Sequence, residues 1–382
     1  MSVPERVLLG PGPSPIAARV MRAMSAPVLS HLDPEMVRLL DDVRVRLTRT
    51  FEAGSEALSF AVSGTGTAGM EAAVCNLVQP GMRVLAVVNG YFGDRLAQIC
   101  ARQGGAVTRV ESDWGRACDV AQVQRMFQAA PADLLAFVHA ETSTGVLNPA
   151  EDLARLAASH GALTIVDAVT SLAAMPLHVE AWGLDVCYSC SQKGLGAPSG
   201  LAPIVFSPRA LARRSAPASF YLDLTLLEDY WIRRRYHHTV SAPLIYALRE
   251  ALVMTEEEGL AARWARHERH HRALVAGLEA LGLSLLPPPG ERLWTLNAVR
   301  VPDGIDEAAV RRALLDQFSI EIGAGLGPLA GRIWRVGLMG SGSTLSNVLL
   351  FVSALERVLR EQGYASASHS AAALAAESAA RS

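Results

Sequence analysis

The chain has 382 residues, half of them hydrophobic and 19% charged, a composition typical of a globular protein of about two or three domains. Its formal net charge of −2 provides no basic field for nucleic acid or an anionic membrane, and no uninterrupted apolar run reaches the ~18 residues of a membrane span. Five cysteines, an odd number, and a start without the apolar core of a signal peptide predict a reducing compartment, the cytoplasm.

The first half of the chain predicts a sheet covered by helices. The stretch "LLGPGPSP", residues 8–15, alternates proline and glycine too densely for a regular element and predicts a fixed extended segment. Continuous apolar strands between amphipathic helices indicate an α/β fold with a mostly parallel sheet covered on both faces. We expect helices at 34–50, 92–104, 120–130 and 149–161, and strands at 83–89, 107–112, 133–140, 162–168 and 185–191.

The second half predicts a long helical region and then a smaller α+β domain. The helical pattern runs from residue 243 to 281 with a break near Gly259, and shorter elements follow to residue 363. We therefore expect an N-terminal extended segment at 1–20, a large domain at 21–258 and a small C-terminal domain at 259–364. Residues 365–382 are rich in alanine and serine, which predicts a frayed low-complexity tail.

Lys193, in "YSCSQKGLGAPSG", is the only lysine of the chain. Lysine plus arginine total 35, so 35 − 1 = 34 of these residues are arginines. A lysine amine can lose its proton when it is desolvated and can then attack a carbonyl carbon, whereas arginine stays protonated. Drift toward arginine codons would leave the same pattern, so the surroundings of Lys193 have to decide.

Two further features fall where a sheet of this kind binds ligands. Asp167 ends the apolar strand "TIVDA", where it can meet a cation or simply cap the next helix. Residues 62–74, "VSGTGTAGMEAAV", form a Gly/Thr turn running into a helix, which is either a phosphate cradle or only a tight turn. A cradle, an acid and a lone amine in one crevice fit pyridoxal phosphate, because the amine binds its aldehyde and the acid keeps the ring nitrogen protonated.

At this point the motifs match a family. From residue 8 to about residue 360 the chain resembles class V aminotransferases of pyridoxal-phosphate fold type I, close to alanine–glyoxylate and serine–pyruvate aminotransferases. The motifs that carry the resemblance are "SQKGLGAPSG", "HAETSTGVLNP", "YFGDR", "YHHT", "YALREAL" and "GLGPLAGRIWRVGLMG".

The resemblance implies a cofactor role for each matching position. Lys193 would form the Schiff base and Asp167 would pair with the pyridinium nitrogen. Phe92 would stack on the cofactor ring where many relatives have tryptophan, and Thr142 would lie beside the ring hydroxyl. The phosphate would be held by Thr65, Gly66, Thr67 and Gln192, and by Tyr236 and Thr239 of the neighbouring subunit. The site therefore implies a homodimer with shared active sites.

The resemblance also implies a substrate site and a reaction. Arg335 would bind the substrate carboxylate as a bidentate fork, although a surface-strand arginine would look the same in the sequence. Gly12 and His31 complete the expected substrate-binding set. The substrates would be a small amino acid and a 2-oxo acid, with the amino group of alanine or serine passing to glyoxylate or pyruvate by a ping-pong mechanism.

One alternative keeps the reaction and changes the donor. The segments "APVLSHLDPEM", "FYLDLTLLEDYW" and "GPLAGRIWRVG" also resemble bacterial ureidoglycine–glyoxylate aminotransferases. That group typically has Gln and Asn where this chain has His31 and Tyr236, and it carries extra residues before "SFYLDL". Without these amides a ureido group is expected to be discriminated poorly. A second alternative keeps the cofactor and changes the reaction, to that of a lyase or a cysteine desulfurase of the same fold. A desulfurase needs a mobile-loop cysteine near the C-terminal domain and is disfavoured because the last cysteine is Cys190. A non-catalytic cofactor-binding protein is a third alternative.

Two motifs suggest metal or redox chemistry, but we assign no metal site to either. Residues 267–271, "HERHH", match H-E-x-x-H, but neighbouring arginines crowd the motif and no third ligand is present, so a solvated helix face is expected. "CYSC", with Cys187 and Cys190, lies in a strand pattern that points the two side chains to opposite faces.

Overall fold

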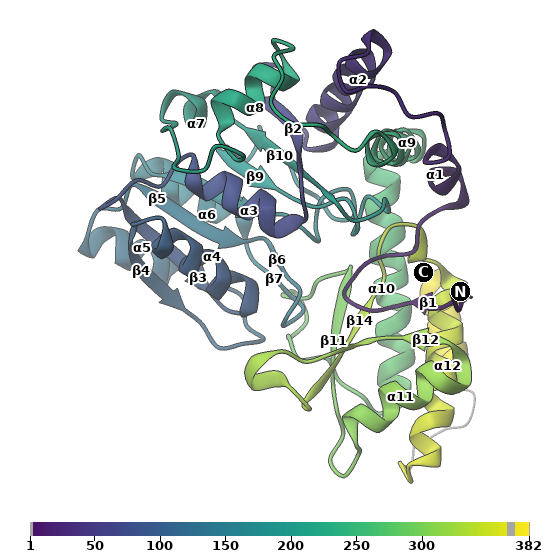
Figure 1. Ribbon diagram of the computed structural model, residues 1–382. Coiled ribbons are helices and arrows are strands. Elements are labelled where there is room, and N and C mark those ends of the chain that lie inside the picture. The colour runs from purple at the N-terminus through teal and green to yellow at the C-terminus, as the bar shows by residue number, and fades with distance from the viewer. Residues whose placement is uncertain (1–2, 365–370, 382) are drawn as a thin grey trace.

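A large mixed sheet forms the centre of the N-terminal part of the molecule (Figure 1). The structure is a computed structural model that describes residues 3–364 and 371–381. Within these residues the sheet has seven strands, of which only β10 runs antiparallel to its neighbours. The order is β2 (Leu58–Ser63), β10 (Leu201–Phe206), β9 (Val186–Tyr188), β8 (Leu163–Asp167), β5 (Leu134–Val138), β3 (Arg83–Val88) and β4 (Ala106–Glu111).

Helices pack around this sheet, as the alternating pattern predicted (Figure 1). Several begin at an aspartate whose side chain accepts a hydrogen bond from the first turn, such as Asp33 before α2 and Asp119 before α5. The predicted helix over 34–50 is confirmed as α2. The surrounding helices are α2 (Pro34–Thr50), α3 (Gly66–Cys75), α4 (Tyr91–Arg102), α5 (Val120–Ala129), α6 (Ala150–Ser159), α7 (Pro208–Ala212) and α8 (Leu224–Trp231).

Two long helices lead from the sheet to the smaller C-terminal part. Helix α9 (Ala242–Glu258) packs on α1 (Ala18–Ala23) and α2, and α10 (Leu260–Ala280) follows directly. Gly259 joins the two helices with a φ of +80°, a backbone conformation that glycine adopts without strain. The predicted break near Gly259 is thereby confirmed.

The C-terminal part is an α+β unit, as expected. Its sheet holds β11 (Leu296–Arg300), β14 (Ile333–Gly337) and β13 (Gly323–Ala324), with α11 (Glu307–Phe318) and α12 (Leu345–Glu361) beside it. Strand β1 (Val7–Leu8) pairs with β12 (Ile320–Glu321), so the N-terminal segment begins on this unit. The short elements left are β6 (Ala140–Glu141), β7 (Val146–Leu147) and the 3-10 turns Gly327–Leu329 and Gly340–Gly342.

Buried apolar residues form two main clusters that match these two parts. One runs from Met36 to Leu252, and the other includes Leu9 and residues from Ala273 to Ala376. The chain passes from one cluster to the other around Gly259. We therefore keep 21–258 and 259–364 as the proposed limits of the two domains.

The prediction of a frayed tail is wrong for residues 371–381. These residues form helix α13 (Ala371–Arg381), which packs on α10 and α12 with Ala372 and Ala376 fully buried. The backbones approach closely because Gly277 of α10 lies beside the carbonyl oxygen of Ala372. The remaining tail residues 365–370 and 382 lie outside the described part.

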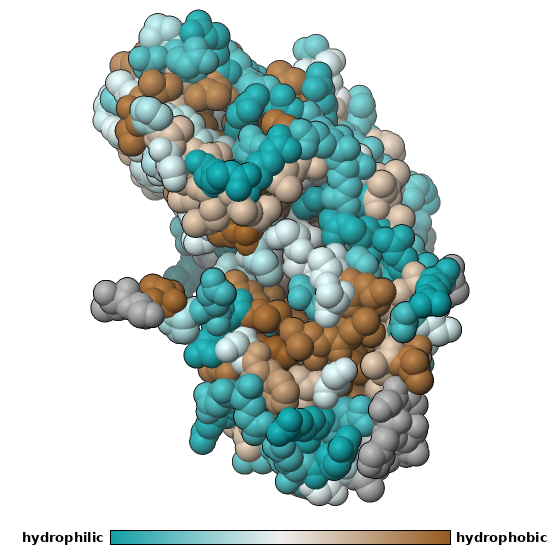
Figure 2. Space-filling view, turned by 90° about the vertical axis from the view of Figure 1, so that its right-hand side faces the viewer, coloured by the Kyte–Doolittle hydropathy of each residue, from teal (hydrophilic) through white to brown (hydrophobic). Residues whose placement is uncertain are grey.

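The side of the molecule that carries α12 and α13 has an apolar area over its lower half (Figure 2). Leu350 of α12 and Leu374 of α13 are exposed large apolar side chains. A search of the helices in the described ranges finds none with the length and apolar character needed to cross a membrane.

Candidate active site

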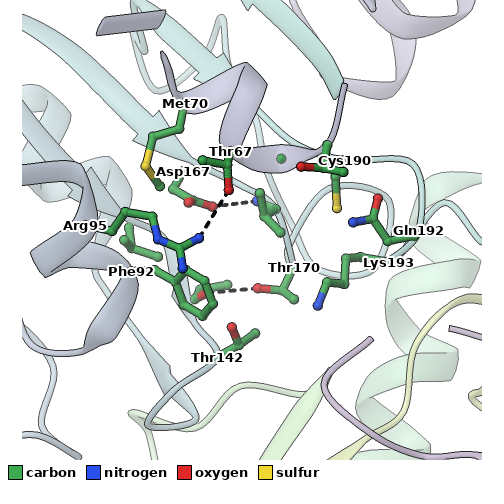
Figure 3. Close-up of a pocket in the computed structure, with 15 residues that line it drawn as sticks. Thr67, Met70, Phe92, Arg95, Thr142, Asp167, Thr170, Cys190, Gln192 and Lys193 are labelled. Atoms are coloured by element: carbon green, nitrogen blue, oxygen red, sulfur yellow. Dashed lines mark hydrogen bonds between the residues drawn. The ribbon is translucent and has the colours of Figure 1, made fainter. Parts of the chain in front are cut away.

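The carboxyl ends of the parallel strands meet around one cavity of about 180 Å³. Asp167 is the last residue of β8, Lys193 lies in the loop after β9, and Thr142 follows β6. Figure 3 shows their side chains with that of Phe92 around one space. The lining residues are Thr65, Gly66, Thr67, Met70, Phe92, Arg95, Val138, Ala140, Thr142, Asp167, Val169, Thr170, Cys190, Gln192 and Lys193.

Lys193 brings its amine into this cavity beside the N-terminal segment. Its Nζ donates a hydrogen bond to the carbonyl oxygen of Pro11, and Gly12 lies so close that an added Cβ would overlap the lysine side chain. Burial lowers the pKa of Lys193; the thiol of Cys190 and the carboxylate of Asp167 oppose this change, and the charge of Arg335 adds to it. A lowered pKa favours the neutral amine that a nucleophile or base requires.

Asp167 is a buried carboxyl group at the wall of the cavity. Its Oδ1 accepts from the N–H of Val169 at 2.8 Å and its Oδ2 from the hydroxyl of Tyr188 at 2.9 Å. Burial and, to a smaller extent, the charge of Glu141 raise the pKa of Asp167, while these hydrogen bonds and Lys193 lower it; the net pKa is about 7. A cation or N–H donor placed in the cavity would therefore stabilise the carboxylate.

The start of helix α3 faces the cavity without a cap of its own. Thr65 is the N-cap residue, but its side chain accepts no hydrogen bond from the helix. The first N–H groups of an α-helix have no acceptor within the helix and attract an anion. Gln192 lies in the same cavity with a buried side-chain oxygen that has no hydrogen-bond partner in the described structure. The first N–H groups of α3 and the NH₂ group of Gln192 are therefore the donors that these residues can offer a phosphate.

Helix α4 brings Phe92 and Arg95 to the cavity wall. The guanidinium carbon of Arg95 lies 5.2 Å from the centre of the Phe92 ring, and its Nη1 donates to Thr67 Oγ1 at 3.1 Å (Figure 3). Sequence reasoning missed Arg95, although it belongs to "YFGDR" and follows Phe92 by three residues, which is one helical turn. Cys190 was considered only as part of "CYSC", and the apolar lining residues were missed, because no pattern in the sequence marks them as facing a cavity.

Arg335 lies on β14 with only 7% of its surface exposed, so the surface-strand alternative is wrong. Its Nε donates to the carbonyl oxygen of Ala324 at 2.6 Å and its Nη1 to that of Thr142 at 3.4 Å. Burial lowers the pKa of Arg335 to about 10, and Glu141 opposes that shift. A buried guanidinium with two carbonyl contacts keeps further N–H donors for an anionic ligand.

Five predicted residues are absent from the cavity lining of their own chain: Gly12, which lies against Lys193, Arg335, which contacts Thr142, and His31, Tyr236 and Thr239. His31 and Tyr236 contact each other, with ring centres 5.1 Å apart, and Tyr236 is 63% exposed. Thr239 is also exposed. Their predicted roles, including contact with a neighbouring subunit, stay predictions.

The solvated helix face expected for "HERHH" is wrong. His267, His270 and His271 are all buried, and each is hydrogen-bonded to protein groups: His267 Nδ1 to the Arg263 carbonyl, His270 Nδ1 to Ser343 Oγ and His271 Nδ1 to Asn297 Oδ1. Burial lowers the pKa of each imidazole, so the neutral rings act as packing and hydrogen-bonding groups. No group of three metal-ligating side chains occurs among residues 3–364 and 371–381.

The residues present fit pyridoxal phosphate. The uncapped start of α3 and the NH₂ group of Gln192 suit the phosphate, and Asp167 suits the ring nitrogen. Phe92 offers a flat apolar face, and Lys193 offers an amine for the aldehyde. Eight of the ten positions that the resemblance assigned to this cofactor line the cavity, namely Thr65, Gly66, Thr67, Phe92, Thr142, Asp167, Gln192 and Lys193.

Comparison with known proteins agrees with this geometry. Alanine–glyoxylate aminotransferase of Drosophila melanogaster is 37% identical over 368 residues, covering 94% of this chain and 93% of the relative. The solved structure of ureidoglycine–glyoxylate aminotransferase from Bacillus subtilis aligns with a TM-score of 0.96 at 36% identity over 100% of both chains. That of alanine–glyoxylate aminotransferase from Nostoc sp. aligns with a TM-score of 0.92 at 45% identity, over 94% of this chain and 97% of that one.

These structural likenesses confirm the expected fold type I architecture of pyridoxal-phosphate aminotransferases. The family model described as aminotransferase class-V matches residues 7–331. The chain therefore belongs to the class-V aminotransferase family.

Proposed function

We propose that this pyridoxal-phosphate-dependent aminotransferase moves the amino group of alanine or serine to glyoxylate or pyruvate in a ping-pong reaction. The observation that carries the proposal is the placement of the only lysine amine in one cavity with buried Asp167 and the open start of α3. Two of the most similar relatives are alanine–glyoxylate aminotransferases, which supports the choice of substrates.

In each half of the reaction, different residues of this chain would carry out different steps. When bound, pyridoxal phosphate supplies a reactive aldehyde and a ring that accepts electrons. Lys193 Nζ would hold the aldehyde end at rest and take the proton from the substrate Cα when the substrate is in place. Asp167 would keep the ring nitrogen protonated, and Phe92 would fix the plane of the ring.

Arg335 would bind the carboxylate that an amino acid and a 2-oxo acid share. Its guanidinium is held by the carbonyl oxygens of Ala324 and Thr142, so it is oriented before a ligand arrives. Gly12 would keep the space beside the amine open, because any side chain there overlaps Lys193. One carboxylate site for both substrates is what a ping-pong exchange requires.

Ureidoglycine is the second candidate donor. The B. subtilis ureidoglycine–glyoxylate aminotransferase matches the whole chain with a TM-score of 0.96. Against it stand His31 and Tyr236, which present two aromatic rings to each other and offer no side-chain amide for a ureido group. We therefore rank alanine and serine first.

We also propose a homodimer in which each cavity is completed by the partner. Tyr236 and Thr239 are exposed and lie outside the cavity of their own chain, and the large side chains of Phe220 and Tyr221 are exposed nearby in the sequence. Aromatic side chains of this kind are enriched at interfaces between subunits. Light scattering is expected to give twice the chain mass of 40.7 kDa, and a monomeric holoenzyme would contradict the shared site.

The cytoplasm remains the proposed location of the enzyme. All five cysteines are buried and none is in a disulfide, which agrees with a reducing compartment. Fractionation of the source cells with a specific antibody would test this placement.

A panel of donors against glyoxylate and pyruvate tests the proposed function. Alanine or serine is expected to exceed ureidoglycine in kcat/KM by roughly tenfold or more, because the site lacks the amides that would read a ureido group. The keto-acid product of each donor is measured by a coupled assay. If amino-group transfer is faster from ureidoglycine than from alanine or serine, ureidoglycine is the donor. If none of the three donors gives amino-group transfer, the proposal is refuted.

Arg335→Gln serves as a variant arm of the same panel. Its kcat/KM is expected to fall roughly 10²-fold for every donor and acceptor, because all of them lose the same charged fork. Arg332→Gln is the matched control, since Arg332 is exposed and lies three residues earlier in the chain. If the Arg335 variant lost activity with the amino acids alone, the shared carboxylate site would be wrong.

A further inference from the structure

Glu141 is a fully buried carboxylate between two cavity-lining residues, Ala140 and Thr142, and the reaction described above gives it no role. It ends strand β6 within the "HAETSTG" motif. Its Oε1 accepts from the N–H of Ser143 at 3.0 Å and from the hydroxyl of Ser143 at 2.6 Å. Its Oε2 accepts from the N–H groups of Phe92 at 3.1 Å and Gly93 at 3.0 Å. Both oxygens are thus used as acceptors.

These contacts give helix α4 a cap from a distant part of the chain. The helix begins after Gly90, which has no side chain to cap it. The N–H of Tyr91 is taken by Ser143 Oγ at 2.8 Å, and the next two N–H groups are taken by Glu141. A carboxylate at this end of a helix also interacts favourably with the helix dipole.

Gly90 shows how closely the two segments approach. Its backbone is extended, with a φ of −180°, so its conformation alone does not require glycine. A Cβ at this position, however, would overlap Cγ and Cδ of Glu141 and lie 2.6 Å from Ser143 Oγ. The cap and the absence of a side chain at residue 90 therefore depend on each other.

Helix α4 in turn holds two side chains against the cavity. Phe92 and Arg95 line it from the N-terminal turns of the helix, and Arg95 reaches Thr67 at the start of α3. The charge of Glu141 also acts on Asp167 and Arg335, two ionisable groups of the site. A displacement of Glu141 would therefore change the position of Phe92 and Arg95 and the electrostatic environment of Asp167 and Arg335.

We propose that Glu141 is a positioning residue that caps helix α4 from a distant part of the chain and thereby fixes Phe92 and Arg95 against the bound cofactor. The proposal rests on the cofactor role assigned under the proposed function. Glutamine is not an adequate substitute, because its NH₂ group cannot accept and would face either Ser143 or the N–H groups of the helix. The substitution therefore removes hydrogen bonds at the start of α4, the part of the helix that carries Phe92.

Glu141→Gln tests the cap in the cofactor-free protein. We expect amide hydrogen exchange in peptides spanning residues 89–95 to become at least tenfold faster. In the reconstituted protein we expect the dissociation constant for pyridoxal phosphate, measured by absorbance titration, to rise at least tenfold. The circular dichroism band of the bound cofactor should weaken, because the ring is no longer held at one angle.

Asp185→Asn is the matched control. Asp185 is also a buried carboxylate that accepts from a backbone N–H, that of Thr164 at 2.9 Å, and from the hydroxyl of Ser207 at 3.1 Å. It lies just before β9, at the end of the strand away from Lys193. This variant should lose thermal stability while the exchange of residues 89–95, the cofactor affinity and the dichroism band stay as in the wild type.

Gly90→Ala covers the case in which the glutamine variant does not fold. It keeps every polar group of the network and displaces Glu141 by overlap, so the same three changes are expected. Unchanged exchange at residues 89–95, or faster exchange with unchanged affinity and dichroism, would overturn the proposal. Failure of the wild type to bind pyridoxal phosphate would refute the proposed function and the cofactor half of this inference, whereas the exchange experiment would still decide whether Glu141 caps α4.

Discussion

Replacing Lys193 with arginine is expected to abolish amino-group transfer, with kcat/KM falling by at least about 10³-fold. The substitution keeps a positive charge, and arginine is the residue that the chain uses at its 34 other Lys/Arg positions. What it removes is an amine that can lose its proton, because the guanidinium stays protonated at any working pH. Transfer from alanine to glyoxylate in the purified variant is the measurement.

Chemical trapping separates loss of the amine from loss of the fold. Borohydride treatment of the wild-type holoenzyme should leave the cofactor covalently attached to the peptide that contains residue 193, as mass spectrometry would show. The Lys193→Arg protein should carry no such label, while its far-ultraviolet circular dichroism stays like that of the wild type. An active arginine variant, or a label on another residue, would refute the role of Lys193.

Replacing Asp167 with asparagine should lower kcat/KM at least about 10²-fold, because the amide cannot hold the cofactor ring nitrogen in its protonated form. Asparagine fits the site in shape: its oxygen can accept from the N–H of Val169, and the hydroxyl of Tyr188 can turn to accept from its NH₂. The loss should therefore appear in activity and in the absorbance spectrum of the bound cofactor. Wild-type activity in this variant would contradict the assignment.

The same substitution should stabilise the cofactor-free protein at alkaline pH. Burial raises the pKa of Asp167 from 3.8 to about 7. A carboxyl with a raised folded pKa contributes stability that is present below pH ~4 and lost as the pH rises through 7. The neutral amide avoids this loss, so Asp167→Asn should exceed the wild type at pH 8 by roughly 1–4 kcal/mol and match it near pH 4.

Thermal unfolding of the cofactor-free proteins at pH 4 and pH 8 measures this difference. Asp133→Asn is the control with the opposite sign. The hydrogen bond from Arg83 lowers the pKa of Asp133, so its carboxylate stabilises the fold above the unfolded pKa, and its loss should lower the midpoint at pH 8. A melting midpoint of Asp167→Asn below that of the wild type at pH 8 would show that the buried carboxyl of Asp167 has no raised pKa.

Elements with a strong local pattern could be predicted from the sequence. Helix α2 and the alternation of strands and helices from β3 to β8 follow from hydrophobic spacing, which reports the buried face directly. The break at Gly259 follows from the rarity of a left-handed backbone in other residues. The prediction for the tail failed because alanine and serine carry no such pattern, and α13 is held by its packing on α10 and α12 instead.

Some residues of the candidate site could likewise be predicted from the sequence, and others could not. Lys193 and the Gly/Thr turn at the start of α3 could be found because each is unusual in the sequence: one is the only lysine, and the other is a local motif with known chemistry. Arg95 could not be told from the other arginines, and the buried histidines of α10 could not be told from solvated ones. Nothing local in the sequence distinguishes a charge or a ring that faces a cavity from one that faces water.

The sequence by itself determined the residue types of the site and the local elements that carry them. The chemistry of a lysine amine, the backbone conformations open to glycine and the spacing of hydrophobic residues are all properties of short stretches. Only the tertiary structure decided that Glu141 caps a helix from a much earlier part of the chain and that Arg335 is buried beside Thr142. Such contacts join segments far apart in the chain. They exist because the fold brings the β6–β7 hairpin against helix α4 and against the C-terminal sheet, and no local pattern encodes which side chains meet there.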